Sequence, residues 1–140
     1  MNETPSGRNP LRSTAAVFLG IFVVFVLSLG TDQVLHVLKI YPPWGEAMWD
    51  HRLNALALSY RIVYGVVGGF VTAKTAPRNP LRHAMIMGWI GFGLSVMGAI
   101  GGIMMKAGPA WYPIVLALTA LPCAWLGGRL GETRNLAVAR

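Results

Sequence analysis

Hydrophobic positions along this chain form long uninterrupted runs. Residues 13–31, 84–105 and 107–128 contain no Asp, Glu, Lys or Arg. Each run reaches or exceeds about 18 residues, the length at which an apolar segment becomes a candidate for a membrane-spanning helix. The pattern therefore predicts three transmembrane helices.

A fourth span is predicted over residues 53–73, although Arg61 lies inside it. Without this span, the apolar stretch 62–73 would lie between two other spans with nothing to cover it. A segment at membrane depth satisfies its backbone groups by forming a helix. We therefore expect an all-α membrane protein in which residues 1–140 form a single transmembrane domain of four helices.

Composition agrees with a membrane environment. Hydrophobic residues make up 54% of the chain and charged residues 12%, whereas a soluble domain has about 25% charged residues. The net charge of +7 is compatible with nucleic-acid binding. However, Lys and Arg are scattered at the ends of the apolar runs and form no patch with interleaved aromatics, so we expect the lipid bilayer, and no nucleic acid, as the partner.

The basic residues are unevenly divided between the two predicted sides of the membrane. Most lie at the N-terminus, in the connection between the second and third spans, and at the C-terminus. They are Arg8, Arg12, Lys74, Arg78, Arg82, Arg129, Arg134 and Arg140. The positive-inside rule then places both termini in the cytoplasm. Aromatic residues within 41–49 and 111–112 fit a belt at the opposite interface.

A short motif recurs along the chain. The pentapeptide Arg-Asn-Pro-Leu-Arg occupies 8–12 and again 78–82, each time just before an apolar run. This predicts two helical hairpins, about 8–76 and 78–131. Both hairpins start on the same side, so the repeat is parallel, with a pseudo-two-fold axis along the membrane normal. The repeat also favours a retained first helix over the alternative of a cleavable signal peptide.

Small residues at spacings of three or four occur in three of the predicted spans. The three seams are Gly65, Gly69 and Ala73; Gly91, Ser95, Gly98 and Gly102; and Ala120, Ala124 and Gly128. Small residues let helix backbones approach closely in a membrane, so we expect a tight bundle with little internal cavity. The same seams could instead join the chain to a second copy or to a membrane-protein partner. The bulky residues Phe18, Phe22 and Phe25 suggest that the first helix lies partly toward lipid.

Two charged residues are predicted within the membrane. Asp32 precedes Tyr41 by nine positions and Arg61 follows Arg52 by nine, so both lie about 13 Å along a helix from the same surface. An unpaired charge at membrane depth costs about 2.5 to 3.5 kcal/mol. We therefore expect an ion pair between Asp32 and Arg61.

Other polar side chains are near enough in sequence to join this pair. The candidate intramembrane polar cluster is Asp32, Arg61, His36, Gln33, Tyr60 and Tyr64. In a functional interpretation, Asp32 and His36 bind a cation or relay protons at a site open to the outside, while Arg61 tunes their pKa values or binds an anion. In a structural interpretation, the ion pair fixes the register of the first hairpin.

No pattern in the sequence predicts a catalytic residue, a metal site or a cofactor. Glu46, Asp50, His51 and His36 lack the spacing of a known ligand motif. Cys123 is a single cysteine within a span, where packing is its expected role. No nucleophile, base and orienting group can be assembled, which argues against an enzyme.

Four segments resemble a group of small bacterial inner-membrane proteins with four predicted spans. The segments are YPPWGEAMW, YRIVYGVVGGFVTAKTAP, RNPLRHAMIMG and LPCAWLGGRLG. The resemblance covers nearly the whole chain and implies a multi-pass protein of the bacterial inner membrane. We can attach no activity to this group, so the resemblance brings no catalytic residue to this sequence.

Two classes of function remain open on the sequence. The first is a non-enzymatic helix bundle that acts as an interaction partner or accessory subunit. The alternative is a small transporter or ion-conducting oligomer that uses the outward-facing polar cluster. A water-accessible cavity at the cluster would favour transport, whereas a dry pair sealed by Tyr60 and Tyr64 would favour the first class.

Overall fold

The computed structural model describes residues 9–138, and side chains up to residue 133. Within this range the chain is helical, with no strand. The helices are α1 (Pro10–Val37), α2 (His51–Thr75), α3 (Pro80–Met104) and α4 (Trp111–Val138). All four are long and apolar enough to cross a membrane. The predicted all-α fold with four candidate spans is therefore confirmed.

Local chemistry explains where three of the helices begin. Pro10 and Pro80 lie in the first turns of α1 and α3, where the missing N–H of proline would have no intrahelical partner in any case. At the start of α2, the Asp50 side chain accepts a hydrogen bond of 2.7 Å from the backbone N–H of Arg52. This satisfies one of the donors that a helix leaves free at its first turn.

The first helix is longer than its apolar run. It continues through the polar positions after residue 31 and ends at Val37. The chain then reverses at Lys39, whose φ is 57°. The backbone N–H groups of Ile40 and Tyr41 both donate to the carbonyl oxygen of Leu35, at 3.0 and 3.2 Å. This return folds Tyr41 back onto the bundle, where it is buried.

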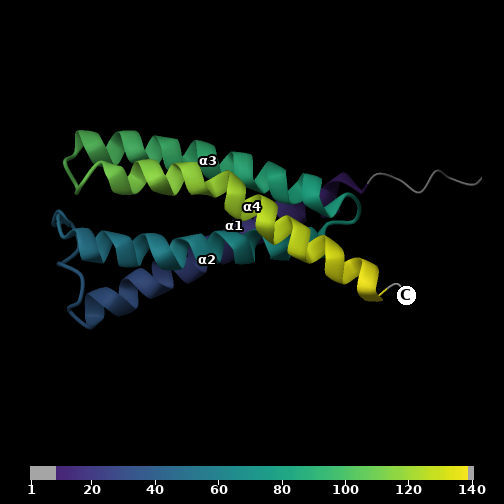
Figure 1. The fold of residues 1–140 in the computed structure, drawn as a ribbon, viewed down its shortest axis with the longest axis horizontal. Helices are drawn as coiled ribbons and strands as arrows, with labels where there is room; N and C mark the ends of the chain where they lie inside the picture. The colour runs from purple at the N-terminus through teal and green to yellow at the C-terminus, as the bar shows by residue number, and fades with distance from the viewer. Residues whose placement is uncertain (1–8, 139–140) are drawn as a thin grey trace, which may run out of the picture.

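The four helices run antiparallel to their neighbours in sequence (Figure 1). We call the end that carries the connections 38–50 and 105–110 the aromatic end, and the end that carries 76–79 the terminal end. Helix α4 packs extensively on both α2 and α3, whereas α1 packs on α2 and α3 but not on α4. In Figure 1 the α1–α2 ribbons and the α3–α4 ribbons diverge toward the aromatic end.

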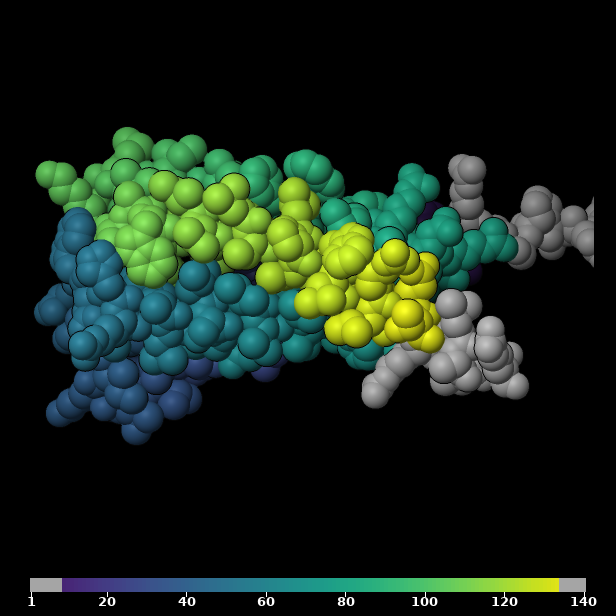
Figure 2. Space-filling model, viewed as in Figure 1, coloured from purple at the N-terminus to yellow at the C-terminus, as the bar shows by residue number. Residues whose placement is uncertain are grey.

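Helices α2 and α4 approach each other backbone to backbone. A Cβ atom added at Gly69 would lie 2.8 Å from the carbonyl oxygen of Ala124, and one added at Gly127 would collide with the carbonyl oxygen of Val66. Only glycine permits this approach. Figure 2 shows α4 lying over α2 along this crossing.

The small residues of α3 do not make such a close approach to another helix. A Cβ added at Gly91, Gly98 or Gly102 would meet no atom within 4 Å, so these positions do not pack against another helix. They lie beside open space, and Gly91 and Gly98 line a cavity of about 390 Å³ between all four helices. The expectation of little internal cavity is therefore wrong. The reason is that α1 does not close against α4.

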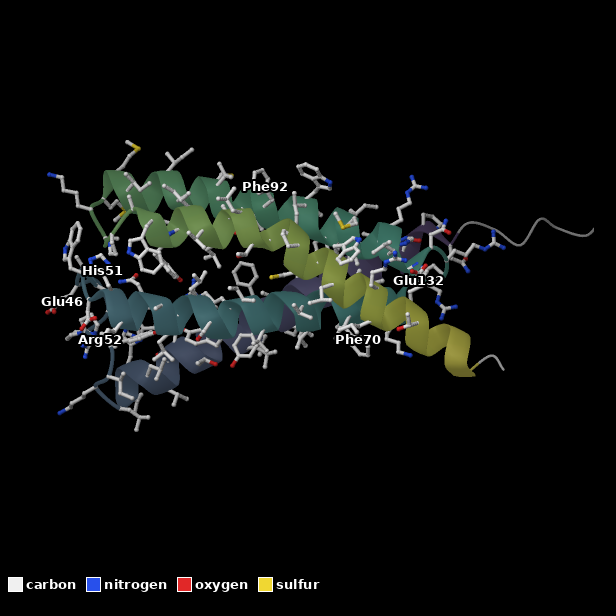
Figure 3. All side chains as sticks on the ribbon, in the orientation of Figure 1. Glu46, His51, Arg52, Phe70, Phe92 and Glu132 are labelled. Carbon is white, nitrogen blue, oxygen red and sulfur yellow. The ribbon has the colours of Figure 1, made fainter. Side chains whose placement is uncertain are left out.

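Large apolar side chains cover much of the outer surface. Phe18 and Phe22 of α1 are 66% and 65% exposed, as expected for a helix that faces lipid. Figure 3 shows polar side chains gathered at the two ends of the bundle, with His51 and Arg52 at the aromatic end and Glu132 toward the terminal end. This division matches an apolar slab between two aqueous layers.

Candidate functional site

The predicted ion pair is present between α1 and α2. Asp32 is buried, with 6% of its surface exposed. Its Oδ2 atom accepts a hydrogen bond of 2.5 Å from a terminal nitrogen of Arg61. Its Oδ1 atom accepts a short hydrogen bond from the Tyr60 hydroxyl. Both oxygens of the buried carboxylate therefore have a charge-assisted or phenolic donor, which compensates for its removal from water.

Tyr41 extends this network and was not among the predicted members. Its hydroxyl shares a hydrogen bond of 3.2 Å with the hydroxyl of Tyr60 and lies 3.5 Å from the carbonyl oxygen of Leu53. Burial raises the pKa of the Tyr41 phenol, because removal from water disfavours the phenolate. Tyr41 therefore stays protonated at neutral pH. Its sequence position indicated an interfacial aromatic, and nothing in the sequence signals the chain reversal that buries it.

The Arg61 guanidinium also lies over an aromatic ring. Its Cζ atom lies 6.0 Å from the centroid of the Tyr112 ring, a cation–π distance. Its Nε atom is buried and has no hydrogen-bond partner among the described residues. Arg61 is thus paired with Asp32 through a terminal nitrogen, while its Nε–H has no acceptor among the described residues.

Two predicted members of the cluster lie apart from the Asp32 carboxylate. His36 bonds through Nδ1 to the backbone carbonyl oxygen of Asp32 at 2.7 Å, and its ring stacks on Trp44 with the centroids 3.9 Å apart. Gln33 is exposed and accepts a hydrogen bond of 3.2 Å from the indole N–H of Trp44. Trp44 therefore holds His36 and Gln33 beside the network, which the His36 ring meets through an edge contact with the Tyr41 ring, at 5.4 Å between centroids.

Tyr64, the last predicted member, also lies away from the Asp32 carboxylate. Its hydroxyl lies 2.8 Å from the Thr31 hydroxyl, and its ring tilts against that of Tyr60 with the centroids 5.7 Å apart. The predicted six-residue cluster is therefore divided. Asp32, Tyr60 and Arg61, joined by Tyr41, form what we call the clasp.

Two hollows lie near the clasp, and neither is lined by Asp32. A depression of about 800 Å³ at the aromatic end is lined by residues of the segment 33–53, including Gln33, His36 and Trp44. The interior cavity of about 390 Å³ is lined by Arg61 but not by its partner. The carboxylate is therefore closed off by its own hydrogen-bond donors.

The polar residues at the aromatic end make contacts within the fold. The indole N–H of Trp111 donates to Nδ1 of His51 at 2.8 Å, which ties the start of α4 to the start of α2. Among the residues that the structure describes, no three His, Cys, Asp or Glu side chains gather where they could hold a metal ion.

Comparisons with protein-family models, with curated proteins and with solved structures give no match for this chain. The fold and the site define its class instead. It is a multi-pass helical membrane protein in which an ion pair with a buried carboxylate joins the first two helices.

Proposed function

We propose that this protein is a non-catalytic helix bundle that acts as an interaction partner or accessory subunit, in a bacterial inner membrane and with both termini in the cytoplasm. The observation that carries the proposal is the closed state of Asp32. A carboxylate that relays protons or releases a cation must exchange with water. Both oxygens of Asp32 are instead engaged by Tyr60 and Arg61, which supports a clasp that holds α1 against α2.

The lipid-facing side of α3 is the surface that we propose for partner binding. A Cβ added at Gly93 or Gly101 would meet no atom within 4 Å, and Met97 between them is 71% exposed. Small residues on an open helix face allow another helix to approach closely in the bilayer. The proposed partner is a transmembrane helix of another protein that itself carries a small-residue face.

The internal repeat remains part of the proposal. Its basis is the recurring pentapeptide at 8–12 and 78–82. The two hairpins differ in their packing, since α3 contacts α2 whereas α1 does not contact α4.

Site-specific crosslinking in cells tests the partner surface. A photoreactive amino acid at Met97 is expected to give discrete protein adducts. The same group at Phe22, which is similarly exposed on α1, should give only lipid adducts. Adding Gly93→Leu and Gly101→Leu should reduce the Met97 adducts about tenfold, because a bulky face holds the partner away. Lipid adducts alone at both positions would contradict the proposal.

A small transporter or ion-conducting oligomer is the second candidate. It is favoured by one observation, that Arg61 borders a cavity lined by all four helices. Purified protein in liposomes with an imposed pH gradient distinguishes the two candidates. We expect proton flux no higher than in protein-free liposomes. Flux in the wild type that is lost in Asp32→Asn would replace our proposal with the transport function.

A further inference from the structure

The three histidines of the chain use their ring nitrogens in two ways. His36 and His83 bond through Nδ1 to backbone carbonyl oxygens, at 2.7 and 3.1 Å. A carbonyl oxygen only accepts, so these two rings donate, and they still donate when the ring is protonated. Nδ1 of His51 instead accepts a hydrogen bond of 2.8 Å from the indole N–H of Trp111. Of the three, His51 alone needs an unprotonated Nδ1 for its hydrogen bond.

The chemistry of the two rings makes the His51–Trp111 bond sensitive to pH. An indole nitrogen only donates, and a neutral imidazole accepts through one nitrogen, whereas a protonated imidazole donates from both. Protonation of His51 therefore sets two N–H groups against each other. Imidazoles become charged as the pH falls between about 8 and about 5. The bond is therefore made at the upper end of this range and lost toward the lower end.

The surroundings of His51 provide no ion pair for a charged ring. His51 is exposed and is the first residue of α2, where the helix dipole disfavours a cation. Within residues 9–133, no carboxylate forms an ion pair with it. The ionisable side chains on the elements around it are Asp50 and Glu46 of the preceding connection, Arg52 of α2, Lys106 of the connection 105–110 and Tyr112 of α4. Among the two carboxylates, that of Asp50 already caps the backbone of α2.

The bond lies far from the place where α2 and α4 cross. The crossing is at Gly69 and Gly127, where the backbones meet. His51 precedes Gly69 by 18 positions, which is about 27 Å along the helix. The α1–α2 and α3–α4 ribbons diverge over this distance (Figure 1). A contact at the diverging end holds the two helices together more effectively than one near the crossing.

Other contacts at the diverging end do not respond to the same pH range. The Arg61 guanidinium lies over the Tyr112 ring, and the backbone N–H of Met48 donates to the carbonyl oxygen of Ala107 at 2.8 Å. Arginine and tyrosine side chains ordinarily change charge only at about pH 10 or above, and a backbone amide does not titrate. The His51–Trp111 bond is the contact here that acid removes.

We infer that the His51–Trp111 hydrogen bond is a pH-sensitive latch, which holds the start of α4 to the start of α2 at neutral pH and releases it in acid. The proposed orientation places this end outside the cytoplasm, so the latch responds to external pH. That sidedness rests on the proposed function, whereas the latch itself does not.

Exchange of indole N–H protons with water tests the bond. It is followed by NMR of the full chain in lipid nanodiscs, with ¹⁵N-labelled tryptophan. Trp44 is the internal reference, because its indole donates to the side-chain oxygen of Gln33, which does not titrate. The ratio of the Trp111 rate to the Trp44 rate is expected to rise about fivefold from about pH 8 to about pH 5. A constant ratio would overturn the inference.

Two matched variants assign the change to one histidine. In His51→Asn, the side-chain oxygen can accept from the indole but does not titrate, so the ratio should no longer depend on pH. His36→Asn makes the same change at another histidine of the aromatic end and should leave the fivefold rise intact. A rise that persists in His51→Asn, or that disappears in His36→Asn, contradicts the latch.

The distance between two spin labels tests whether the bond holds the helices together. The labels are attached in a Cys123→Ala background through Leu38→Cys and Met105→Cys, at exposed positions of the two connections. We expect the distance distribution to shift to longer values at about pH 5, and to show no pH dependence when His51→Asn is added. Loss of the bond without a change in distance would mean that other contacts hold α4 to α2, and the latch would be rejected.

Discussion

Replacing Arg61 with Gln is expected to destabilise the protein by about 3 to 5 kcal/mol, because it leaves a buried carboxylate without its counter-charge. Asp32 is 6% exposed, and in the variant only Tyr60 would still donate to it. Equilibrium unfolding in mixed micelles, followed by helical circular dichroism, measures the change in the free energy of unfolding.

The double variant is the control for this prediction. Asp32→Asn should cost less than Arg61→Gln, since the Arg61 side chain is 29% exposed and keeps its contact with Tyr112. Asp32→Asn combined with Arg61→Gln should be more stable than Arg61→Gln alone, because no unpaired charge remains. Additive effects of the two changes would mean that the residues are not coupled, and the clasp would lose its structural role.

The parts of the fold that the bilayer imposes could be predicted from the sequence. A membrane span requires a long apolar helix, so the three uncharged runs located α1, α3 and α4, and the apolar stretch that follows Arg61 located α2. The Asp32–Arg61 pair could be predicted for a related reason. Two opposite charges at one depth in a membrane have few other ways to be compensated.

The boundaries of the site could not be predicted in the same way. The first apolar run ends where Asp32 and Gln33 begin, yet α1 continues to Val37, because polar residues remain helical once they are paired or near the surface. The position of Tyr41 depends on a chain reversal at Lys39. A positive φ at a lysine has no signature in the sequence. The spacing of residues therefore did not indicate that Tyr41 belongs to the clasp.

The small-residue seams show a further limit of sequence patterns. The spacing of Gly65, Gly69 and Ala73 resembles that of Gly91, Ser95 and Gly98. Gly69 contacts the backbone of α4, whereas Gly91 and Gly98 border open space. Small residues at helical spacing allow another helix to approach closely. Which helix approaches depends on how the helices cross, and that crossing is a property of the tertiary structure.

This difference between glycines leads to the second large prediction. Gly127→Ala is expected to destabilise the protein by about 3 kcal/mol, since the added methyl group would meet the backbone of α2 at Val66 and Phe70, and backbone atoms cannot move aside without separating the helices. Gly93→Ala makes the same chemical change where no atom lies within 4 Å. It should raise stability by up to about 1 kcal/mol, because alanine is the better helix former. Thermal unfolding of both variants in one detergent gives the comparison. Equal stability would mean that α2 and α4 do not cross in direct backbone contact.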